Sequence, residues 1–214
     1  MKVQLLTEIY QKLLQHYGPQ YWWPAKSTFE MMVGAILTQN TNWSNVKKCL
    51  EKMELNRLLH AETLHLLSAE ELAPHLQSAG YFNLKAKRLK NLVHYLVENY
   101  QVDFERMKKQ EIKTLRTELL AVKGVGPETA DSILLYGLEK LVFVIDQYTY
   151  RVLSRHALIP EESDYESMQE LMMGNLPEDL DLYKEYHALI VRVGNEFCKP
   201  KPRCEMCPLK GVNW

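Results

Sequence analysis

The chain lacks the compositional features that mark several protein classes. Its 214 residues include four cysteines, which are too few and too clustered for a disulfide scaffold. Nine glycines and nine prolines exclude a collagen-like or low-complexity chain. The longest apolar run, 141–145, is far shorter than the ~20 residues that cross a bilayer. Residues 1–17 mix charged with apolar side chains, unlike a signal peptide. We therefore expect a cytoplasmic protein without a membrane partner.

An excess of positive charge is also missing. The 26 Lys and Arg are balanced by 27 Asp and Glu, and the pI of about 6.7 lies below the ~9 that is common in nucleic-acid-binding domains. Basic residues nevertheless gather in 84–92 and in 197–214, whereas 160–185 is acidic. These two basic stretches predict either a local basic surface or ordinary solvated helix faces.

Apolar residues recur three or four positions apart along nearly the whole chain, which is the spacing of amphipathic helices. Clear examples are Leu5, Ile9, Leu13 and Leu14; Phe29, Met32, Val33, Ile36 and Leu37; and Leu89, Leu92, Val93 and Leu96. Ser27 and Glu30 form a capping-box pattern before the second run. Only 141–145 resembles a strand, and this run is too short to form a sheet alone. We predict an all-α fold of about ten short helices, arranged as one large domain or two small ones.

A tight glycine turn stands out within 119–131. An apolar helix is expected to end near Lys123, Gly124 and Gly126 flank Val125, and a proline follows at the first position of the next helix. Such a turn exposes backbone N–H groups at the start of the second helix, where they can bind an anion such as a DNA phosphate. The alternative is a plain helical hairpin that has no ligand.

Asp146 directly follows the apolar run 141–145, which favours a partly buried setting for its carboxylate. Asp146 can cap the helix that follows, and it can also serve in catalysis. The two roles are compatible.

Together these two stretches resemble the helix-hairpin-helix DNA glycosylases of the endonuclease III superfamily. The matching positions are Gly124, Val125, Gly126, Thr129, Ala130, Asp146, Arg151 and Val152. The resemblance implies an all-α fold of two lobes, a six-helix lobe over 27–137 and a second lobe of 1–26 with 138–214 that ends in a cysteine loop. It also implies base-excision repair of double-stranded DNA that contains damaged bases. We expect the protein to act as a monomer.

The resemblance also assigns roles to individual residues. Asp146 is implied to be the catalytic carboxylate, and Gln39 to probe the DNA at the lesion. The residues implied to bind the DNA backbone are Lys123, Gly124, Val125 and Gly126. Bifunctional members carry a nucleophilic Lys two residues after the second hairpin glycine, where this chain has Glu128. A carboxylate cannot form an imine, so we predict a monofunctional glycosylase that leaves an abasic site.

An aromatic cluster narrows the resemblance to 3-methyladenine DNA glycosylase III. Trp22, Trp23 and Pro24 precede the first helix of the six-helix lobe, and Trp43 follows Gln39 by four residues. The base pocket implied by this likeness contains Trp22, Trp23, Pro24, Trp43 and Glu128, with Trp22 and Trp43 holding the flipped base. Stacking on an aromatic ring is worth ~1–3 kcal/mol per base. The alternative for each Trp is core packing.

The C-terminal cysteines resemble the [4Fe–4S] loop of the superfamily. Cys198, Cys204 and Cys207 are present, but the first gap holds five residues where six are usual, and Asn213 stands where a fourth Cys is expected. Cys49 lies in the other lobe. The three thiols are an incomplete cluster motif that could hold a cluster with an unusual fourth ligand or Zn²⁺ with a His, or could remain ordinary thiols.

Two other functions stay open at this point. One is a bifunctional endonuclease III-like glycosylase and AP lyase, against which Glu128 argues. The other is a non-catalytic helix-hairpin-helix DNA-binding protein, against which Asp146 and the aromatic cluster argue.

Overall fold

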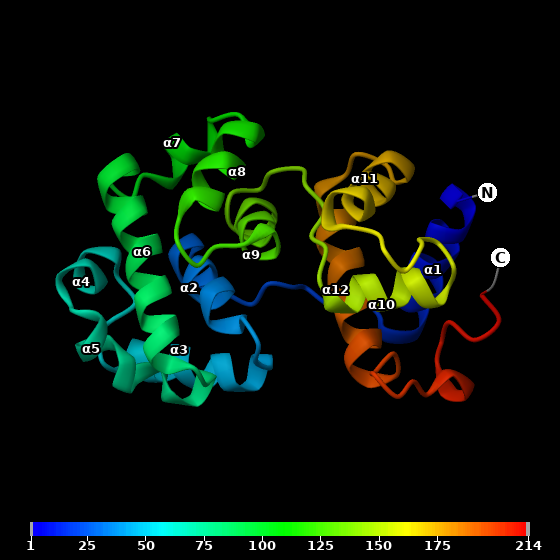
Figure 1. Cartoon of the computed structure of the whole chain (residues 1–214), viewed down its shortest axis with the longest axis horizontal. Coiled ribbons are helices and arrows are strands. Elements are labelled where there is room, and N and C mark those ends of the chain that lie inside the picture. Colours follow the sequence, from blue (N-terminus) through cyan, green and yellow to red (C-terminus); the bar gives the residue numbers. More distant parts are fainter. Residues whose placement is uncertain (1, 213–214) are drawn as a thin grey trace. The chain divides into compact units, whose positions relative to one another are not determined.

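The computed structural model describes residues 2–212, and the regular elements within that range are all helical (Figure 1). The chain divides into two compact units. The terminal unit contains the described residues up to Trp22 and those from Leu141 onward, and the central unit is Trp23–Lys140. No helix among the described residues has the length and apolar character needed to cross a membrane.

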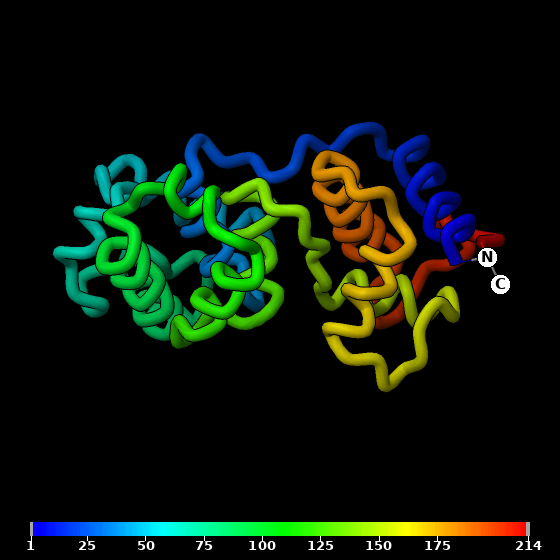
Figure 2. The backbone as a smooth tube through the Cα atoms, turned by 90° about the horizontal axis from the view of Figure 1, so that it is seen from above, coloured from blue at the N-terminus to red at the C-terminus, as the bar shows by residue number. Residues whose placement is uncertain are grey.

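The terminal unit is built from both ends of the chain, as the blue and the yellow-to-red segments of Figures 1 and 2 show. Its helices are α1 (Lys2–Tyr17), α10 (Gln147–Arg155), α11 (Tyr165–Asn175) and α12 (Leu180–Glu196), followed by the short 3₁₀ helix η3 (Cys204–Met206). Helices α1 and α10 both pack on α12. Tyr186 of α12 is buried, and its hydroxyl donates a hydrogen bond to the Leu6 carbonyl of α1 at 2.8 Å. Apolar burial therefore joins the two ends of the chain.

The central unit surrounds one apolar helix. Its elements are α2 (Thr28–Thr38), α3 (Trp43–Leu55), α4 (Ala61–Leu66), α5 (Ala69–Leu72), η1 (Ala73–Ala79), α6 (Phe82–Tyr100), α7 (Phe104–Lys108), α8 (Ile112–Ala121), α9 (Pro127–Ser132) and the π-helical turn η2 (Ile133–Gly137). Every residue of α2 from Phe29 to Leu37 except Glu30 is buried. Such a helix is stable only when other elements cover all its sides, and α3, α6, α9 and η2 pack on it.

The predicted capping box before α2 is only half formed. Ser27 Oγ accepts a hydrogen bond from the Glu30 backbone N–H at 3.1 Å, which satisfies one free N–H of the first turn. The Glu30 carboxylate accepts from the backbone N–H of Lys26 at 3.3 Å instead of reaching back to Ser27. The cap on the helix is therefore present, while the reciprocal bond has moved one residue upstream.

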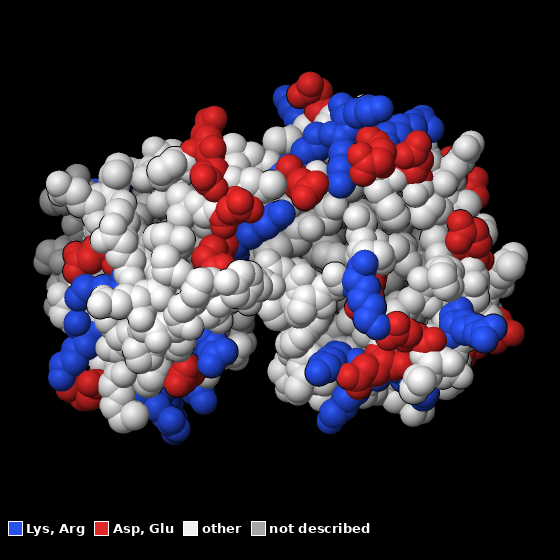
Figure 3. Space-filling model, turned by 180° about the vertical axis from the view of Figure 1, so that it is seen from behind, with Lys and Arg blue, Asp and Glu red and all other residues white. Residues whose placement is uncertain are grey.

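The basic stretch 84–92 forms neither of the two surfaces predicted for it, because most of its cations bind the protein itself. The buried Lys85 donates to the carbonyls of Leu37 and Ala79, both at 2.8 Å. Lys90 donates to two carbonyls near the end of α4. Burial lowers the pKa of both amino groups. On the face shown in Figure 3, Lys and Arg lie among Asp and Glu on both units.

The boundaries between the two units lie a few residues away from the predicted positions 26/27 and 137/138. Trp23 belongs to the central unit, because its indole packs against Trp43 and Tyr136. Lys140 also belongs there, because its Nζ donates to the carbonyl of Gln110 at 2.7 Å and to that of Lys108. Tertiary contacts of single side chains thus decide where each unit ends.

Candidate functional site

Asp146 caps the N-terminus of α10, as one of its two expected roles requires. Its Oδ1 accepts hydrogen bonds from the Thr149 backbone N–H at 2.7 Å and from the Thr149 hydroxyl at 2.8 Å. Its Oδ2 lies 3.6 Å from Nε2 of His187 on α12, and the Asp146 side chain is only 8% exposed. A carboxylate is thereby held, nearly buried, at the positive end of a helix.

The contacts of Asp146 determine its charge. Burial taken alone raises the pKa of this carboxyl group, because it disfavours the anion. Hydrogen bonding and charge from His187, together with the two hydrogen bonds from Thr149, outweigh burial and leave the pKa of Asp146 below its ordinary value. Asp146 is therefore an anion at neutral pH. An anion fixed in this way can stabilise positive charge that develops beside it.

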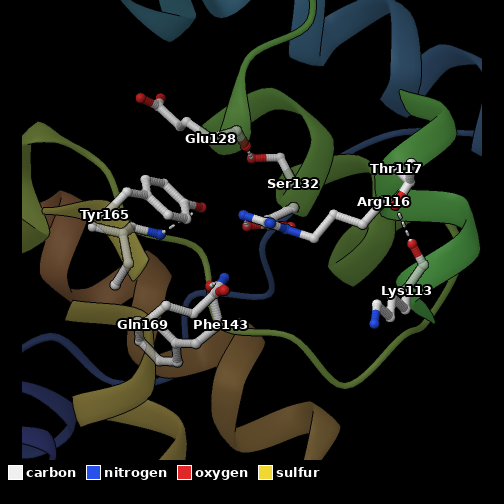
Figure 4. Close-up of polar contacts among 10 residues, drawn as sticks. Lys113, Arg116, Thr117, Glu128, Ser132, Phe143, Tyr165 and Gln169 are labelled. Atoms are coloured by element: carbon white, nitrogen blue, oxygen red, sulfur yellow. Dashed lines mark hydrogen bonds and ion pairs between the residues drawn. The ribbon is translucent and has the colours of Figure 1, made fainter. Parts of the chain in front are cut away.

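The segment that leads to Asp146 is held in place by α11 (Figure 4). The Tyr165 hydroxyl accepts a hydrogen bond from the Ile145 N–H at 3.3 Å, and Gln169 Nε2 donates to the Phe143 carbonyl at 2.7 Å. These two side chains lie one helical turn apart on α11, so they hold two successive points of the segment. The run that resembled a strand is extended and mostly buried, but no strand is formed within 2–212.

The predicted hairpin joins α8 to α9. Helix α9 begins with a proline, and Gly126 precedes it as an N-cap that provides no side-chain hydrogen bond. Gly124 has φ +102°, and a Cβ there would collide with the side chain of Arg88. Glycine is therefore required at 124 both for the left-handed backbone and for the close approach of Arg88. Asn91 Nδ2 donates to the Lys123 carbonyl at 2.8 Å, which anchors the start of the turn.

A buried ion pair joins the two helices of the hairpin. Arg116 of α8 reaches Asp131 of α9 with Nε–Oδ1 and Nη2–Oδ2 distances of 2.8 and 3.2 Å, and the Asp131 side chain is fully buried. Figure 4 shows the extended side chain of Arg116. Loss of one partner from a buried pair costs about 3–5 kcal/mol, because the other charge is left uncompensated. This pair therefore stabilises the packing of α8 against α9.

Gln39 lies just after α2 and is bound to the hairpin. Its Nε2 donates to the Gly124 carbonyl and to Thr129 Oγ1, both at 3.0 Å, and its Oε1 accepts from Arg88. Insertion of this side chain into a DNA duplex requires those bonds to break. Gln39 also couples the loop after α2 to the hairpin turn.

The aromatic cluster is divided between the two units. In the central unit, Trp23 packs edge-to-face on Trp43, with a centroid distance of 5.3 Å and an interplanar angle of 86°, and also contacts Tyr136. The Trp23 indole lies over Gly34, where a Cβ would be 3.2 Å from its Nε1. Trp23 is therefore part-buried and packs against side chains of the central unit. Trp22 belongs to the terminal unit.

Trp22 lines a cavity of about 660 Å³ in the terminal unit, together with aromatic and acidic side chains. Its other lining residues are Tyr10, Leu14, Pro19, Tyr21, Pro177, Asp179, Asp181, Leu182, Lys184 and Glu185. Pro24 and Glu128 are exposed on the central unit. Figure 4 shows the Glu128 carboxylate directed away from Ser132, whose hydroxyl donates to the Glu128 carbonyl at 2.7 Å.

The three C-terminal cysteines lie together. Cys198, Cys204 and Cys207 line one cavity of about 250 Å³ in the terminal unit. Burial raises the pKa of the Cys207 thiol, and the charges of the other two thiols raise it further. Cys49 is buried in the central unit, where its Sγ lies 2.9 Å from Ser78 Oγ. The predicted position of the missing fourth ligand, Asn213, lies outside the described residues.

Several side chains around these sites were not identified from the sequence. Thr149 and His187 hold Asp146, and Arg88 and Arg116 hold the hairpin. The position of Thr149, three residues after the cap, is a signal that the sequence does contain. His187 is 41 positions from Asp146, and no local pattern links the two residues.

Comparison with known proteins places these features in context. The sequence model of the HhH-GPD superfamily, base excision DNA repair proteins, matches residues 33–178. The chain is 46% identical to a protein of Methanocaldococcus jannaschii described as a DNA repair glycosylase, over 98% of this chain and 96% of that one. A 3-methyladenine DNA glycosylase of H. pylori, solved with 1,N6-ethenoadenine, has a TM-score of 0.79 and 30% identity and covers 91% of this chain and 97% of that one.

A structure of a non-covalent endonuclease III–DNA complex has a TM-score of 0.82 at 19% identity and covers 99% of this chain and 94% of that one. At that identity the likeness concerns the fold. The all-α fold predicted from the sequence is confirmed.

Proposed function

The chain belongs to the HhH-GPD superfamily of base excision DNA repair proteins, and we propose that it is a monofunctional DNA N-glycosylase that removes alkylated purines such as 3-methyladenine. The observation that carries this proposal is the Asp146 carboxylate, kept ionised by Thr149 and His187 at the start of α10. Its substrate is double-stranded DNA that contains a damaged base.

The proposed reaction needs an anion and no general acid. A purine methylated at N3 carries a positive charge, so it leaves the sugar without being protonated. The sugar then develops oxocarbenium character, and Asp146 stabilises that charge and orients or deprotonates the attacking water. The depressed pKa of Asp146 suits this task, because a protonated carboxyl group would supply neither effect.

Glu128 supports hydrolysis without strand cleavage. It is exposed at the second residue of α9, the position where the resemblance expects the nucleophilic amine of a bifunctional enzyme. Its carboxylate cannot form a Schiff base with the sugar. Lys123 lies before the hairpin turn, and we assign it, with Gly124, Val125 and Gly126, to the DNA backbone.

Base recognition is proposed to rest mainly on Trp22 and Trp43. A flipped base is sandwiched between two ring faces, whereas Trp23 meets Trp43 edge-on and lies over Gly34. Trp23 therefore supports Trp43 and does not offer a second face to the base. An indole also attracts a cationic purine.

Pro24 and Glu128 complete the proposed pocket, and Gln39 would enter the duplex after leaving the hairpin. The 30% identity to a 3-methyladenine DNA glycosylase supports this substrate class.

The test is a base-release assay on methylated duplex DNA, with the freed bases identified by chromatography. We expect 3-methyladenine among the products and strongly reduced release by the Asp146→Asn variant. DNA strands should break only after alkali treatment. Release of oxidised pyrimidines, with a borohydride-trapped covalent complex in good yield, would instead favour the bifunctional alternative. A Lys123→Gln variant would then show whether that residue is the nucleophile.

A further inference from the structure

The cavity that contains the three thiols is also lined by a histidine. His156 lies at the C-terminal cap of α10 and lines the cavity with Cys198, Cys204 and Cys207. The four residues come from two segments, the end of α10 and the loop after α12. Three thiols and one imidazole are a complete set of four soft-metal donors.

The hydrogen bonding of His156 defines which ring nitrogen is available. Its Nδ1 lies 2.7 Å from the carbonyl oxygen of Val212. A carbonyl only accepts, so Nδ1 must carry the proton, and in the neutral ring the lone pair is then on Nε2. Metal-bound histidines almost always donate their other N–H to a carbonyl or a carboxylate, which orients the ring and selects the tautomer.

We propose that His156 Nε2 is the fourth ligand of an iron–sulfur cluster held by Cys198, Cys204 and Cys207. The superfamily loop uses a fourth Cys, and this chain has Asn213 at that place in the sequence. His156 supplies the missing donor from a different element. The residues present therefore fit the group, with one imidazole in place of one thiolate, and His ligands to iron–sulfur clusters have precedent.

The choice of a cluster over a single zinc ion rests on the cysteine loop, which resembles the cluster loop of the superfamily. A tetrahedral zinc draws its sulfurs to ~2.3 Å from one point. Within residues 2–212, no three His, Cys, Asp or Glu side chains are placed to hold one metal ion. The same thiols nevertheless border one cavity of about 250 Å³.

Neighbouring arginines tie the cysteine loop to α10. Arg155 Nη1 lies 3.2 Å from Cys198 Sγ and donates to the Lys199 carbonyl at 2.7 Å, and Arg151 Nε donates to the Cys198 carbonyl at 2.8 Å. A guanidinium beside a thiolate stabilises its negative charge. The cluster would thus fasten the loop to the helix whose opposite end is capped by Asp146. Its role would be structural.

The test uses the full chain, purified anaerobically and reconstituted with iron and sulfide. We expect about four iron atoms per chain and, after reduction, nitrogen hyperfine coupling in pulsed EPR spectra. His156→Ala should lower iron content at least ~10-fold. Removal of a residue that only supports a metal ligand already lowers metal affinity by about that factor. His156→Cys should keep the iron, lose the nitrogen coupling and lower the reduction potential, because imidazole ligands raise it.

The matched control is His60→Ala, which removes an exposed histidine of the central unit and should leave iron content and spectra unchanged. Circular dichroism of each variant separates lost metal from lost fold. The proposal is overturned if wild type takes up zinc and not iron, or binds neither metal. Equal iron in His156→Ala and wild type, or a wild-type cluster without nitrogen coupling, also overturns it. None of these readouts depends on base release, so the proposed function is tested separately.

Discussion

The N-termini of α9 and α10 differ in how their unpaired backbone N–H groups are capped. Each helix starts with unpaired backbone N–H groups and a positive dipole end. At α10 the chain supplies its own anion, because Asp146 accepts from Thr149 and faces His187. At α9 the cap is Gly126, which offers no side-chain hydrogen bond. One terminus is therefore electrostatically completed from within, and the other is suited to an external anion such as a phosphate.

This difference indicates how the two sites divide the proposed work. The positive end of α10 stabilises a carboxylate of the chain itself, which must remain charged. The positive end of α9 has no such carboxylate as its cap, and the turn before it is held by Asn91, Arg88 and the Arg116–Asp131 pair. The predictions below alter one terminus at a time, from the largest expected effect to the smallest.

Asp146→Asn removes the charge from the α10 terminus and keeps an oxygen that can cap the helix. We expect single-turnover base release to fall by about 10²–10³-fold, in line with the loss of a key electrostatic group, and binding to damaged DNA to stay within a few-fold of wild type. Rates close to wild type would remove Asp146 from the catalytic role. An unchanged melting temperature would show that the cap has survived.

Gly124→Ala deforms the α9 side of the comparison. The new Cβ would strike Arg88, and the residue would have to keep φ near +102°. We expect a loss of about 1–3 kcal/mol in the free energy of unfolding together with weaker DNA binding. Gly126→Ala is the matched control, because its φ is −99° and a Cβ there meets nothing within 4 Å. Equal destabilisation by both variants in urea melts would contradict this account of the turn.

Trp22→Ala and Trp43→Ala leave both helix termini intact and remove the proposed base contacts. Each should cost ~1–3 kcal/mol in processing of alkylpurines, with little change in affinity for an abasic analogue, which has no base to stack. Trp23→Ala serves as the comparison, since its packing on Trp43 and Gly34 predicts a lower melting temperature. If Trp22→Ala and Trp43→Ala weaken binding to both DNAs equally and melt early, the base-sandwich assignment is wrong.

His187→Gln tests what keeps the α10 carboxylate ionised. His187 lowers the pKa of Asp146, so without it the effect of burial should prevail and that pKa should rise. In wild type, the pKa in the folded chain is the depressed one. The stability gained from the ionised group is therefore present above the ordinary Asp pKa of ~3.9 and is lost as pH falls through the lower folded value.

The acid limb of base release should accordingly move to higher pH in His187→Gln. The measurement is the pH profile of the single-turnover rate, with exposed His60→Gln as the control. An acid limb that does not move would show that Thr149 alone holds the charge.

Local sequence patterns were sufficient to predict features that depend only on neighbouring residues. The cap at Asp146 and the proline start of α9 are both recognisable in short segments, because capping chemistry acts over three or four residues. The same reasoning failed for the basic stretch 84–92. Whether Lys85 reaches solvent depends on carbonyl groups of Leu37 and Ala79, which the stretch itself does not contain.

The sequence by itself determined the helical class, the glycine turn and the position of the candidate carboxylate, since each depends on periodicity or on steric rules within a few residues. Only the tertiary structure decided which partners complete them. His187 reaches Asp146, Arg116 reaches Asp131, and Arg88 lies over Gly124 because packing brings separate helices together. The charge of a carboxylate follows from its burial and its neighbours, and both are properties of the folded chain.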